Sequence, residues 1–423
     1  METTERSGQP RWHLWLVAGV AVAAALVMVA SFRRQGLVDS VGDPYDYGKI
    51  AHTFVSEGFT KLTRRAASLY PSFLSIIFGL GGDNSAVQLV QCLLHAATCS
   101  LVYVMARRWY SARAGLFAGL FCAIHPMLLR YVPDLHMETW LTFFFTVTVW
   151  CAMQFYDRPS IRNGVLLGFF GTITTLSKGV ALPVLLAYGA FWLYRLWKRA
   201  PGSAKSLPAI MAMGITMAVM IAPWTYRNYR VSGHFVLLTP GTPDAFLRGY
   251  IFTRSEFATL KQPPYTDAEN ESNRLFKRIA KENGTVWEQD ELQDDRNNSK
   301  EAKRMIVEHP FDTLRKCVVG LFTFWYEMTS LRNSLIPFVL AIGNWILAVI
   351  GMRRAQREGR PFFALLLPIL AVNAFVALLI PLGRYSVPVL PTLAVLAGFG
   401  ADTLLSRRGA HAAAPATPPT VSA

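Results

Sequence analysis

Residues 12–51 read WHLWLVAGVAVAAALVMVASFRRQGLVDSVGDPYDYGKIA, and this stretch decides what kind of protein the chain is. Its first half, residues 12–32, is an apolar run that reaches the roughly 20 residues a helix needs to cross a bilayer. Its second half is polar and carries two carboxylates and two tyrosines within residues 42–51. The stretch therefore predicts a membrane span followed by a water-exposed loop that carries chemically active side chains.

Composition extends this interpretation to the whole chain. Of 423 residues, 52% are hydrophobic and only 16% are charged, against roughly 25% charged in soluble domains. Apolar runs of similar length recur along the sequence. Because open sheet edges cannot face lipid, the spanning parts must be helices. The net charge of +15 follows the excess of Lys and Arg in cytoplasmic loops of membrane proteins, so we expect no nucleic-acid partner.

Hydropathy and the placement of Lys and Arg predict about ten transmembrane helices, with both termini in the cytoplasm. We expect the first to be an uncleaved anchor rather than a signal peptide, because its apolar core is longer than roughly 7–15 residues. The predicted spans are residues 12–32, 86–106, 114–129, 139–156, two helices within 163–197, 207–224, 334–352, 361–381 and 386–405.

Four domains follow from this topology. They are an N-terminal membrane module (1–224) with an outer loop at 33–85, an outer segment with an interfacial helix (225–333), C-terminal membrane helices (334–405) and a disordered cytoplasmic tail (406–423). The apolar stretch at 71–82 is too short to span and predicts a further interfacial or re-entrant helix.

The outer segment 225–312 has 13 Lys/Arg and 14 Asp/Glu, which is typical of a water-soluble region. It begins with Phe235-Val236-Leu237-Leu238, a β-like run, and continues into a polar helical pattern over 267–308. We therefore expect a mixed α/β outer loop. Lys178 interrupts the two helices of 163–197. Because a lysine is costly at the bilayer centre, we expect it at the outer turn between them.

The outer segments hold both carboxylates and cations. The basic side chains there run against the positive-inside bias, and an anionic ligand explains them economically, since guanidinium groups bind phosphate in a bidentate manner. A carboxylate beside a bound phosphate is placed to act as a general base on a hydroxyl. The alternative is that these residues cap helices or pair with one another. They are Asp43, Asp46, Asp134 and Glu138, with Arg64, Arg65, Lys178, Arg227, Arg230 and Arg384.

Four short motifs, in order and on the predicted outer side, resemble the GT-C superfamily of membrane glycosyltransferases. The similarity is to its family 39-like enzymes, which include protein O-mannosyltransferases and lipid A aminoarabinose transferases. The motifs are Gly42-Asp43-x-x-x-Tyr47-x-x-x-Ala51, His125-Pro126 with Glu138-Thr139, Pro223-Trp224-x-x-Arg227-Asn228-Tyr229 with Gly233-x-Phe235-Val236, and Arg384-Tyr385-x-x-Pro388-x-x-Pro391.

The resemblance implies a fold, a reaction and a set of residue roles. Such enzymes move a sugar from a polyprenyl-phosphate carrier to an acceptor hydroxyl on a lipid, glycan or protein, on the outer face of the membrane. Asp43 matches the proposed general base of an inverting transfer, and Lys178 and Arg384 are the expected partners of the lipid phosphate. The remaining substrate-binding candidates are Asp46, Tyr47, Arg64, Arg65, Glu138, Arg227 and Tyr385.

The predicted protein is thus an all-α polytopic glycosyltransferase of the bacterial inner (cytoplasmic) membrane, multi-pass, with a periplasmic catalytic face and a role in glycosylation of the cell envelope. Membrane lipids, a lipid-linked sugar donor and the acceptor are its expected partners. No His/Cys cluster indicates a metal, so we expect no cofactor and leave a divalent ion open. The alternative function is a transporter or flippase of a lipid-linked glycan, which predicts ionisable residues near the bilayer midplane and two related halves.

Overall fold

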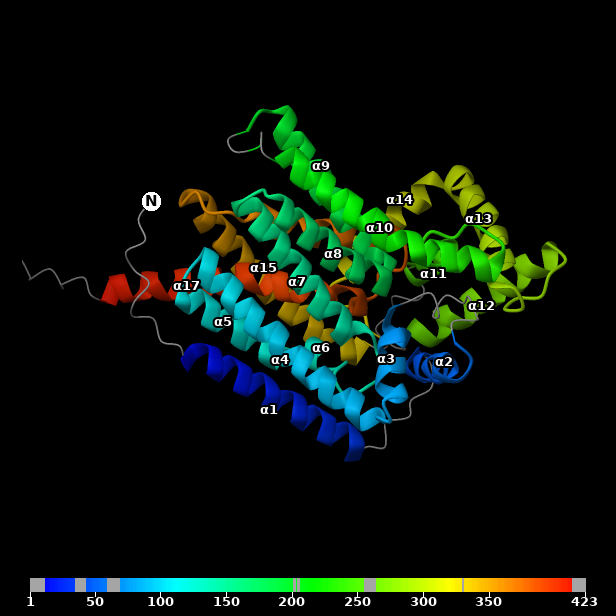
Figure 1. The fold of residues 1–423 in the computed structure, drawn as a ribbon, viewed down its shortest axis with the longest axis horizontal. Coiled ribbons are helices and arrows are strands. Elements are labelled where there is room, and N and C mark those ends of the chain that lie inside the picture. The colour runs from blue at the N-terminus through cyan, green and yellow to red at the C-terminus, as the bar shows by residue number, and fades with distance from the viewer. Residues whose placement is uncertain are drawn as a thin grey trace, which may run out of the picture.

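A computed structural model of the chain describes residues 12–34, 43–58, 69–200, 203, 206–254, 264–328 and 331–412. Figure 1 shows a long bundle whose helices run side by side, with shorter helices gathered at one end. The bundle helices are α1 (Trp12–Arg34), α4 (Asn84–Trp109), α5 (Ala112–Ile124), α7 (Glu138–Asp157), α8 (Ile161–Ser177), α9 (Leu182–Trp197), α10 (Ser206–Ser232), α15 (Leu331–Arg357), α16 (Phe363–Leu378) and α17 (Leu390–Ala412).

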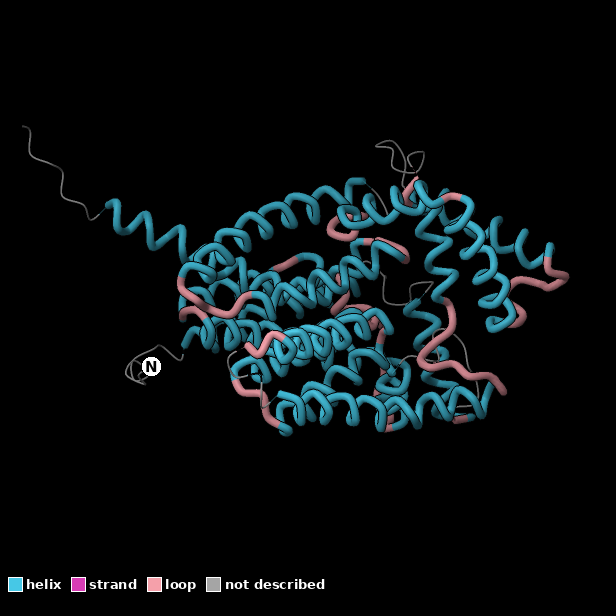
Figure 2. Tube along the Cα trace, turned by 90° about the horizontal axis from the view of Figure 1, so that it is seen from above, coloured by secondary structure: helices cyan, strands magenta, loops and turns pink. Residues whose placement is uncertain are grey.

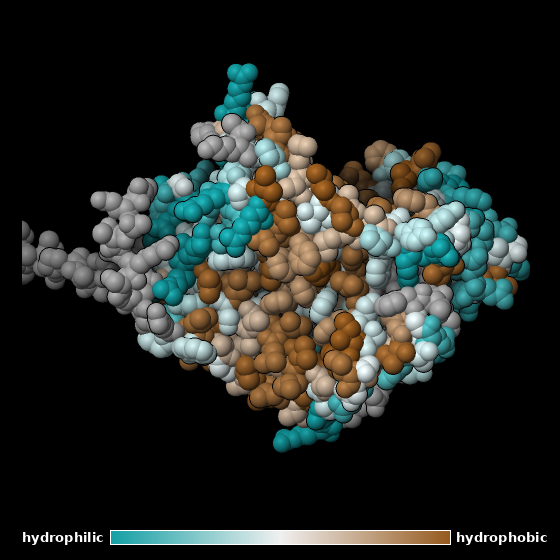
Figure 3. Space-filling view, viewed as in Figure 1, coloured by the Kyte–Doolittle hydropathy of each residue, from teal (hydrophilic) through white to brown (hydrophobic). Residues whose placement is uncertain are grey.

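These ten helices stand at the ten places where the sequence predicts a span. Six segments are long and apolar enough to cross a bilayer, judged by length and composition, within the part of the chain described. They lie at 12–34, 84–109, 179–197, 206–232, 332–357 and 383–406. The all-helical membrane architecture is confirmed, while the count of ten spans stays a prediction. Hydrophobic residues cover the middle of the bundle face in Figure 3, as a lipid-facing surface requires.

Small residues let the bundle helices approach closely. A Cβ atom on Gly164 of α8 would lie 2.1 Å from the carbonyl oxygen of Ala209 on α10. A Cβ atom on Gly400 of α17 would lie 1.9 Å from the carbonyl oxygen of Leu347 on α15. Because lipid supplies no hydrophobic force between helices, such close backbone contact is a main source of their packing energy. The last span, 383–406, is the most enclosed, with 78% of its apolar window buried.

Shorter helices form the other end of the molecule. They are α2 (Asp43–Glu57), α3 (Leu69–Gly79), α6 (Pro126–Leu129), α11 (Thr242–Phe252), α12 (Pro264–Glu282), α13 (Glu291–Glu308) and α14 (Pro310–Thr323), with the 3₁₀ segments η1 (Gly179–Ala181) and η4 (Gly383–Val389). The polar helical pattern over 267–308 is confirmed, although it breaks at Gly284, whose φ of +67° suits glycine. Seen from above, the described chain consists of helices and loops (Figure 2).

The expected strand at 235–238 is wrong. Within the described residues of the outer segment there is no strand, and α10 runs on to Ser232, beyond the boundary at 224 that hydropathy indicates. The side-chain amide of Asn228 donates to the carbonyl oxygens of Val236 and Leu238, both at 3.0 Å. One asparagine thereby satisfies backbone groups that a strand would otherwise pair in a sheet.

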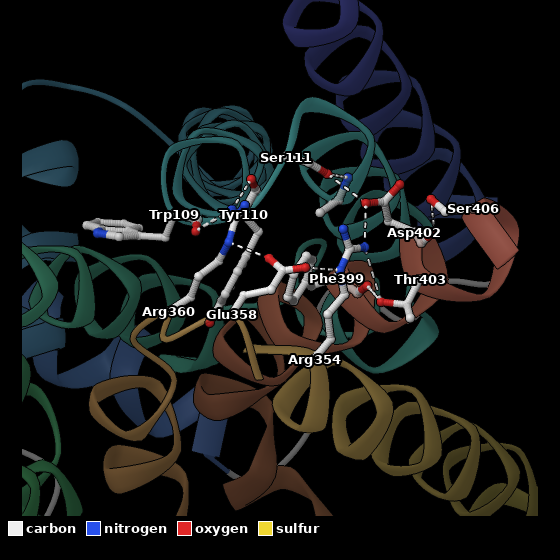
Figure 4. A network of polar contacts seen from close by, with 11 residues as sticks. Trp109, Tyr110, Ser111, Arg354, Glu358, Arg360, Phe399, Asp402, Thr403 and Ser406 are labelled. Atoms are coloured by element: carbon white, nitrogen blue, oxygen red, sulfur yellow. Dashed lines mark hydrogen bonds and ion pairs between the residues drawn. The ribbon is translucent and has the colours of Figure 1, made fainter. Parts of the chain in front are cut away.

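The opposite end of the bundle is closed by a polar network, drawn in Figure 4. Arg354 on α15 lies 3.2 Å from Asp402 on α17, and Ser111 donates to the same carboxylate at 3.0 Å. Arg360 donates to the carbonyl oxygen of Tyr110 at 2.5 Å. These contacts join the α4–α5 turn, the end of α15 and α17. The predicted site residues Asp43 and Arg384 lie at the other end, near α2 and α3.

Candidate functional site

Helix α2 brings Asp43 to Arg384 of η4. Asp43 and Asp46 lie in the first turn of α2, where a negative charge is favoured by the helix dipole. Asp43 Oδ2 lies 2.8 Å from Nη1 of Arg384, a residue 341 positions later in the chain. Both side chains are about one-quarter exposed, at 24% and 28%. A ligand can therefore reach this ion pair.

Arg384 is held by a tight backbone contact. It is the second residue of η4, and the N–H of Gly383 donates to the carbonyl oxygen of Glu327 at 2.6 Å. A Cβ atom on Gly383 would lie only 2.8 Å from that same oxygen. Glycine is therefore needed here so that η4 can approach the turn after α14. This approach fixes the place from which Arg384 extends.

A second cation–carboxylate pair lies beside the first. Lys178 Nζ is 3.3 Å from Oε1 of Glu138, the first residue of α7. The same ammonium is 4.1 Å from the centroid of the Tyr385 ring, and the Arg384 guanidinium is 5.2 Å from it. Lys178 follows the last residue of α8 and precedes η1, which confirms the expected turn between the two helices. Both cations thus lie near the same tyrosine ring.

Glu138 is the most enclosed carboxylate of this group, with 3% of its side chain exposed. Burial raises the pKa of Glu138, but Lys178, His136 and Arg384 more than offset that effect, so its pKa lies below the usual value. Its second oxygen, Oε2, is buried and has no hydrogen-bond partner among the described residues. Glu138 is therefore an ionised carboxylate near the cations Lys178 and Arg384.

Two glutamines of α4 hold the backbone of residues 132–134, between α6 and α7. Gln88 Nε2 donates to the carbonyl oxygen of Pro133 at 2.7 Å. Gln91 Nε2 donates to the carbonyl oxygens of Val132 and Asp134, at 3.0 and 2.8 Å. The signal was available: two amides three residues apart on one face of an apolar helix need buried partners.

Tyrosines line the inner side of the cluster. Tyr47 of α2 is 93% buried and meets the Tyr70 ring edge-on, with centroids 5.4 Å apart. The Tyr70 hydroxyl donates to Gln91 Oε1 at 3.3 Å. Burial, and then the nearby charges of Glu138, Tyr47 and Asp134, raise the pKa of Tyr70 well above its usual value. Tyr70 therefore stays neutral and acts as a hydrogen-bond donor.

The remaining predicted site residues have different positions. Arg227 lies on α10, 5.5 Å from the Trp224 ring, and donates to Asn228 Oδ1 at 3.1 Å. His125 is a helix-end residue, because its Nδ1 accepts from the N–H of Met127 at the start of α6. Asp134 Oδ2 lies 3.1 Å from Nδ1 of His136. Arg64 and Arg65 lie outside the described residues.

With this geometry established, the chain can be compared with known proteins. Residues 67–226 match the dolichyl-phosphate-mannose-protein mannosyltransferase family. They run from α3 through most of α10 and include Glu138 and Lys178. Among curated proteins, no relative matches the chain.

Solved structures share the fold. The oligosaccharyltransferase of Archaeoglobus fulgidus matches with a TM-score of 0.58 at 16% identity, over 95% of this chain and 51% of its own, in a structure tethered to an acceptor peptide. Its apo form matches with a TM-score of 0.57, at 16% identity, over 97% and 52%. ArnT of Cupriavidus metallidurans, bound to undecaprenyl phosphate, matches with a TM-score of 0.37 at 16% identity, over 93% and 78%.

The chain spans about half the length of the archaeal oligosaccharyltransferase that it matches. The fold likeness covers nearly the whole chain, and the family match covers the segment that carries the Glu138–Lys178 pair. On these two findings together, the chain shares its fold with the archaeal oligosaccharyltransferase, and residues 67–226 are similar to the mannosyltransferase family.

Proposed function

We propose that the chain moves a sugar from a polyprenyl-phosphate carrier to an acceptor hydroxyl, with inversion at the sugar carbon and Asp43 as general base. The observation that carries this proposal is the Asp43–Arg384 contact of 2.8 Å, beside the Lys178–Glu138 pair. A base and two cations that suit a phosphate thus lie within one partly exposed group. The match to a family named for a lipid-phosphate sugar donor supports the same class of donor.

Arg384 and Lys178 are the proposed ligands of the donor phosphate. When the bond between the sugar carbon and the phosphate oxygen breaks, its electron pair stays on that oxygen, and the phosphate gains a negative charge. Preorganised cations stabilise charge that develops in this way. Arg384 presents a planar fork of donors that matches phosphate geometry, while Lys178 supplies a compact charge.

Asp43 is the proposed general base. The hydroxyl oxygen of the sugar acceptor forms its bond to the sugar carbon as its hydrogen passes to a carboxylate oxygen of Asp43. The carboxylate becomes neutral while the departing phosphate becomes more negative, so the total charge of the site is unchanged. Arg384 pairs with the Asp43 carboxylate before the reaction. Once Asp43 is protonated, the Arg384 guanidinium pairs with the departing phosphate instead.

The other predicted residues have proposed roles around this centre. Asp46 and Tyr47 follow Asp43 on the same helix, and Tyr385 lies against both cations; we assign all three to substrate contact. Arg64, Arg65 and Arg227 stay proposals for binding of anionic substrate groups. The site would face the periplasm of a bacterial inner membrane, and the acceptor is a lipid, glycan or protein.

The test uses the purified full chain in nanodiscs, with undecaprenyl phosphate as the probe of the donor site. Wild type is expected to bind the probe, and Arg384→Ala is expected to lose binding by at least tenfold, while Arg353→Ala, a change in an arginine at the far end of α15, leaves it intact. An Arg384→Ala protein that binds undecaprenyl phosphate like wild type would remove this residue from the site. A wild type that does not bind the probe would overturn the proposed donor class.

A further inference from the structure

A small hollow in the outer segment takes no part in the proposed reaction. It lies between the start of α11, the turn from α12 to α13 and one face of α13, at the end of the molecule where the shorter helices gather (Figure 1). With its open mouth included, it holds about 330 Å³ of space. This is the volume of roughly eleven water molecules at about 30 Å³ each. The hollow therefore suits one side-chain head group rather than a whole glycan.

Carboxylates dominate the lining of the hollow. They are Asp244, Glu288, Glu291, Asp294 and Asp295. Among the described residues, none that lines the hollow is a lysine or an arginine, although Arg248 pairs with Asp244 from outside it at 3.1 Å. A cleft lined by one sign of charge concentrates ions of the opposite sign. The hollow therefore attracts cations.

The spacing of these carboxylates does not suit a metal ion. Asp295 Oδ1 accepts from the N–H of Gly241 at 2.6 Å, and Asp294 Oδ2 accepts from the N–H of Glu288 at 2.8 Å. Two of the carboxylates thus bind backbone groups of two different segments. Within the part of the chain that the structure describes, no three His, Cys, Asp or Glu side chains are grouped so that they could hold a metal ion. An organic cation, whose donors are spread over several atoms, fits the spaced carboxylates better.

A nearly buried amide faces the same hollow. Asn298 follows Glu291 by seven residues and Asp294 by four, which places all three on one face of α13. Asn298 is only 4% exposed. Its side chain has no hydrogen-bond partner among the described residues, whereas that of Asn297 donates to Thr285 at 3.3 Å. A buried polar group without a partner in the protein calls for one from outside it, and the Asn298 carbonyl oxygen can accept from a bound donor.

An indole ring completes the lining. Trp287 lies in the turn before α13 and is partly buried, and its ring stacks on Phe276 with centroids 5.9 Å apart. Lys277 Nζ lies 5.9 Å from the centroid of the same ring, so the indole already attracts a cation. A guanidinium group stacks on aromatic faces and pairs with carboxylates through its planar fork, whereas an ammonium is a compact point charge. Trp287 therefore favours a guanidinium group.

We propose that this hollow binds a guanidinium group. The carboxylates and Asn298 Oδ1 accept its N–H groups, and the Trp287 ring faces its plane. The group belongs either to a free small molecule or to an arginine side chain of a polypeptide. The site does not depend on the donor lipid, so it goes beyond the proposed function.

The test titrates the purified full chain, in phosphatidylcholine nanodiscs, with three probes by calorimetry. N-acetyl-L-arginine amide stands for an arginine side chain, agmatine for a free guanidinium compound and N-acetyl-L-citrulline amide for a neutral group of the same shape. Wild type is expected to bind at least one guanidinium probe, and to bind the citrulline probe at least tenfold more weakly. The guanidinium probe that binds more tightly shows which source the hollow serves.

Two substitutions connect binding to the hollow. Asn298→Ala removes a hydrogen bond to a charged group and is expected to weaken binding about tenfold. Glu291→Gln keeps the shape of the side chain, removes one charge and is expected to weaken binding about threefold. Glu282→Gln changes an exposed carboxylate of α12 that does not line the hollow, so this matched control should bind like wild type. Because Glu291 is partly exposed, Glu291→Gln gives a result even where Asn298→Ala does not fold.

A wild type that binds neither guanidinium probe, or that binds the citrulline probe as tightly, would overturn the guanidinium site. Binding that neither Asn298→Ala nor Glu291→Gln weakens would lie elsewhere on the chain and would overturn it as well. None of these results bears on the polyprenyl-phosphate donor, which Arg384→Ala tests separately.

Discussion

Replacing Glu138 with glutamine should destabilise the fold and yet favour donor binding. The change removes the negative charge that faces Lys178 at 3.3 Å and keeps the shape of the side chain. The lysine side chain is only 16% exposed, so its ammonium would lose its counter-ion in a largely dry place. Breaking a buried ion pair in this way lowers the free energy of unfolding by about 3–5 kcal/mol. We expect the lower end of this range, because the Tyr385 ring still stabilises the Lys178 ammonium by a cation–π contact.

The pKa of Glu138 determines how the stability difference between wild type and Glu138→Gln changes with pH. The folded-state pKa of Glu138 is depressed, with burial raising it and Lys178, His136 and Arg384 lowering it more strongly. A carboxyl group with a depressed pKa contributes stability above its unfolded pKa of 4.5 and loses it as the pH falls through the folded value. Wild type and Glu138→Gln should therefore differ most at neutral pH and converge in acid.

The assay is thermal unfolding of the detergent-purified chain. With roughly 2.1 cal/mol/K of unfolding entropy per residue over 423 residues, a loss of about 3 kcal/mol corresponds to a Tm decrease of about 3–4 °C. Lys178→Met alone should also destabilise, whereas Glu138→Gln with Lys178→Met should recover most of the loss, because no buried charge is left without a partner. With Glu138 neutral, Lys178 is released towards phosphate, so Glu138→Gln should bind undecaprenyl phosphate at least as tightly as wild type.

An unchanged Tm for Glu138→Gln at pH 7 would show that the pair carries no net energy. A double variant no more stable than either single variant would show that the losses come from packing rather than from an unpaired charge.

Four further predictions follow from the same geometry. Asp43→Asn should lower transfer about 10²–10⁴-fold with normal expression, since asparagine cannot accept the proton; near wild-type transfer in a membrane assay would leave Asp43 only a helix-end role. Arg384→Lys should lower undecaprenyl phosphate affinity because the bidentate geometry is lost, and equal affinity in a titration would contradict this. Burial raises the pKa of Glu327 to about 7, so folded wild type should lose stability as the pH rises from 4.5 to 7; Glu327→Gln should abolish that loss and raise Tm by several degrees at pH 8. A cysteine at position 290 should react with an impermeant thiol reagent from outside cells, and protection there would invert the topology.

The helical bundle could be predicted because apolar length is a local property of the sequence. Each predicted span coincides with a helix, and Lys178 marks its turn since a charged residue is costly within an apolar run. The β-like run at 235–238 is not a strand. Its hydrophobic pattern holds no information about Asn228, whose side-chain amide binds the carbonyl oxygens that a neighbouring strand would bind in a sheet. The local hydrophobic pattern therefore predicts where helices form, but it does not predict which groups hydrogen-bond to the backbone between them.

The sequence predicts candidate site residues but not the contacts between them. Asp43 and Arg384 are 341 positions apart, and only the packing of α2 and η4 at the same end of the bundle makes them partners. The Glu138–Lys178 pair depends in the same way on α7 and α8 lying side by side. The roles of Gln88 and Gln91 could not be predicted, because an amide in an apolar helix is understood only when the loop carbonyls that it binds are known.

The central claim is that the chain consumes a lipid-linked sugar, and the levels of such lipids test it most directly. The measurement is mass spectrometry of polyprenyl-phosphate glycosides in membranes of cells that lack the chain, cells that carry wild type and cells that carry Asp43→Asn. We expect one polyprenyl-phosphate sugar to accumulate without the chain, to stay high with Asp43→Asn and to return to its normal level with wild type. Identical polyprenyl-phosphate glycoside profiles in all three kinds of cell would contradict it.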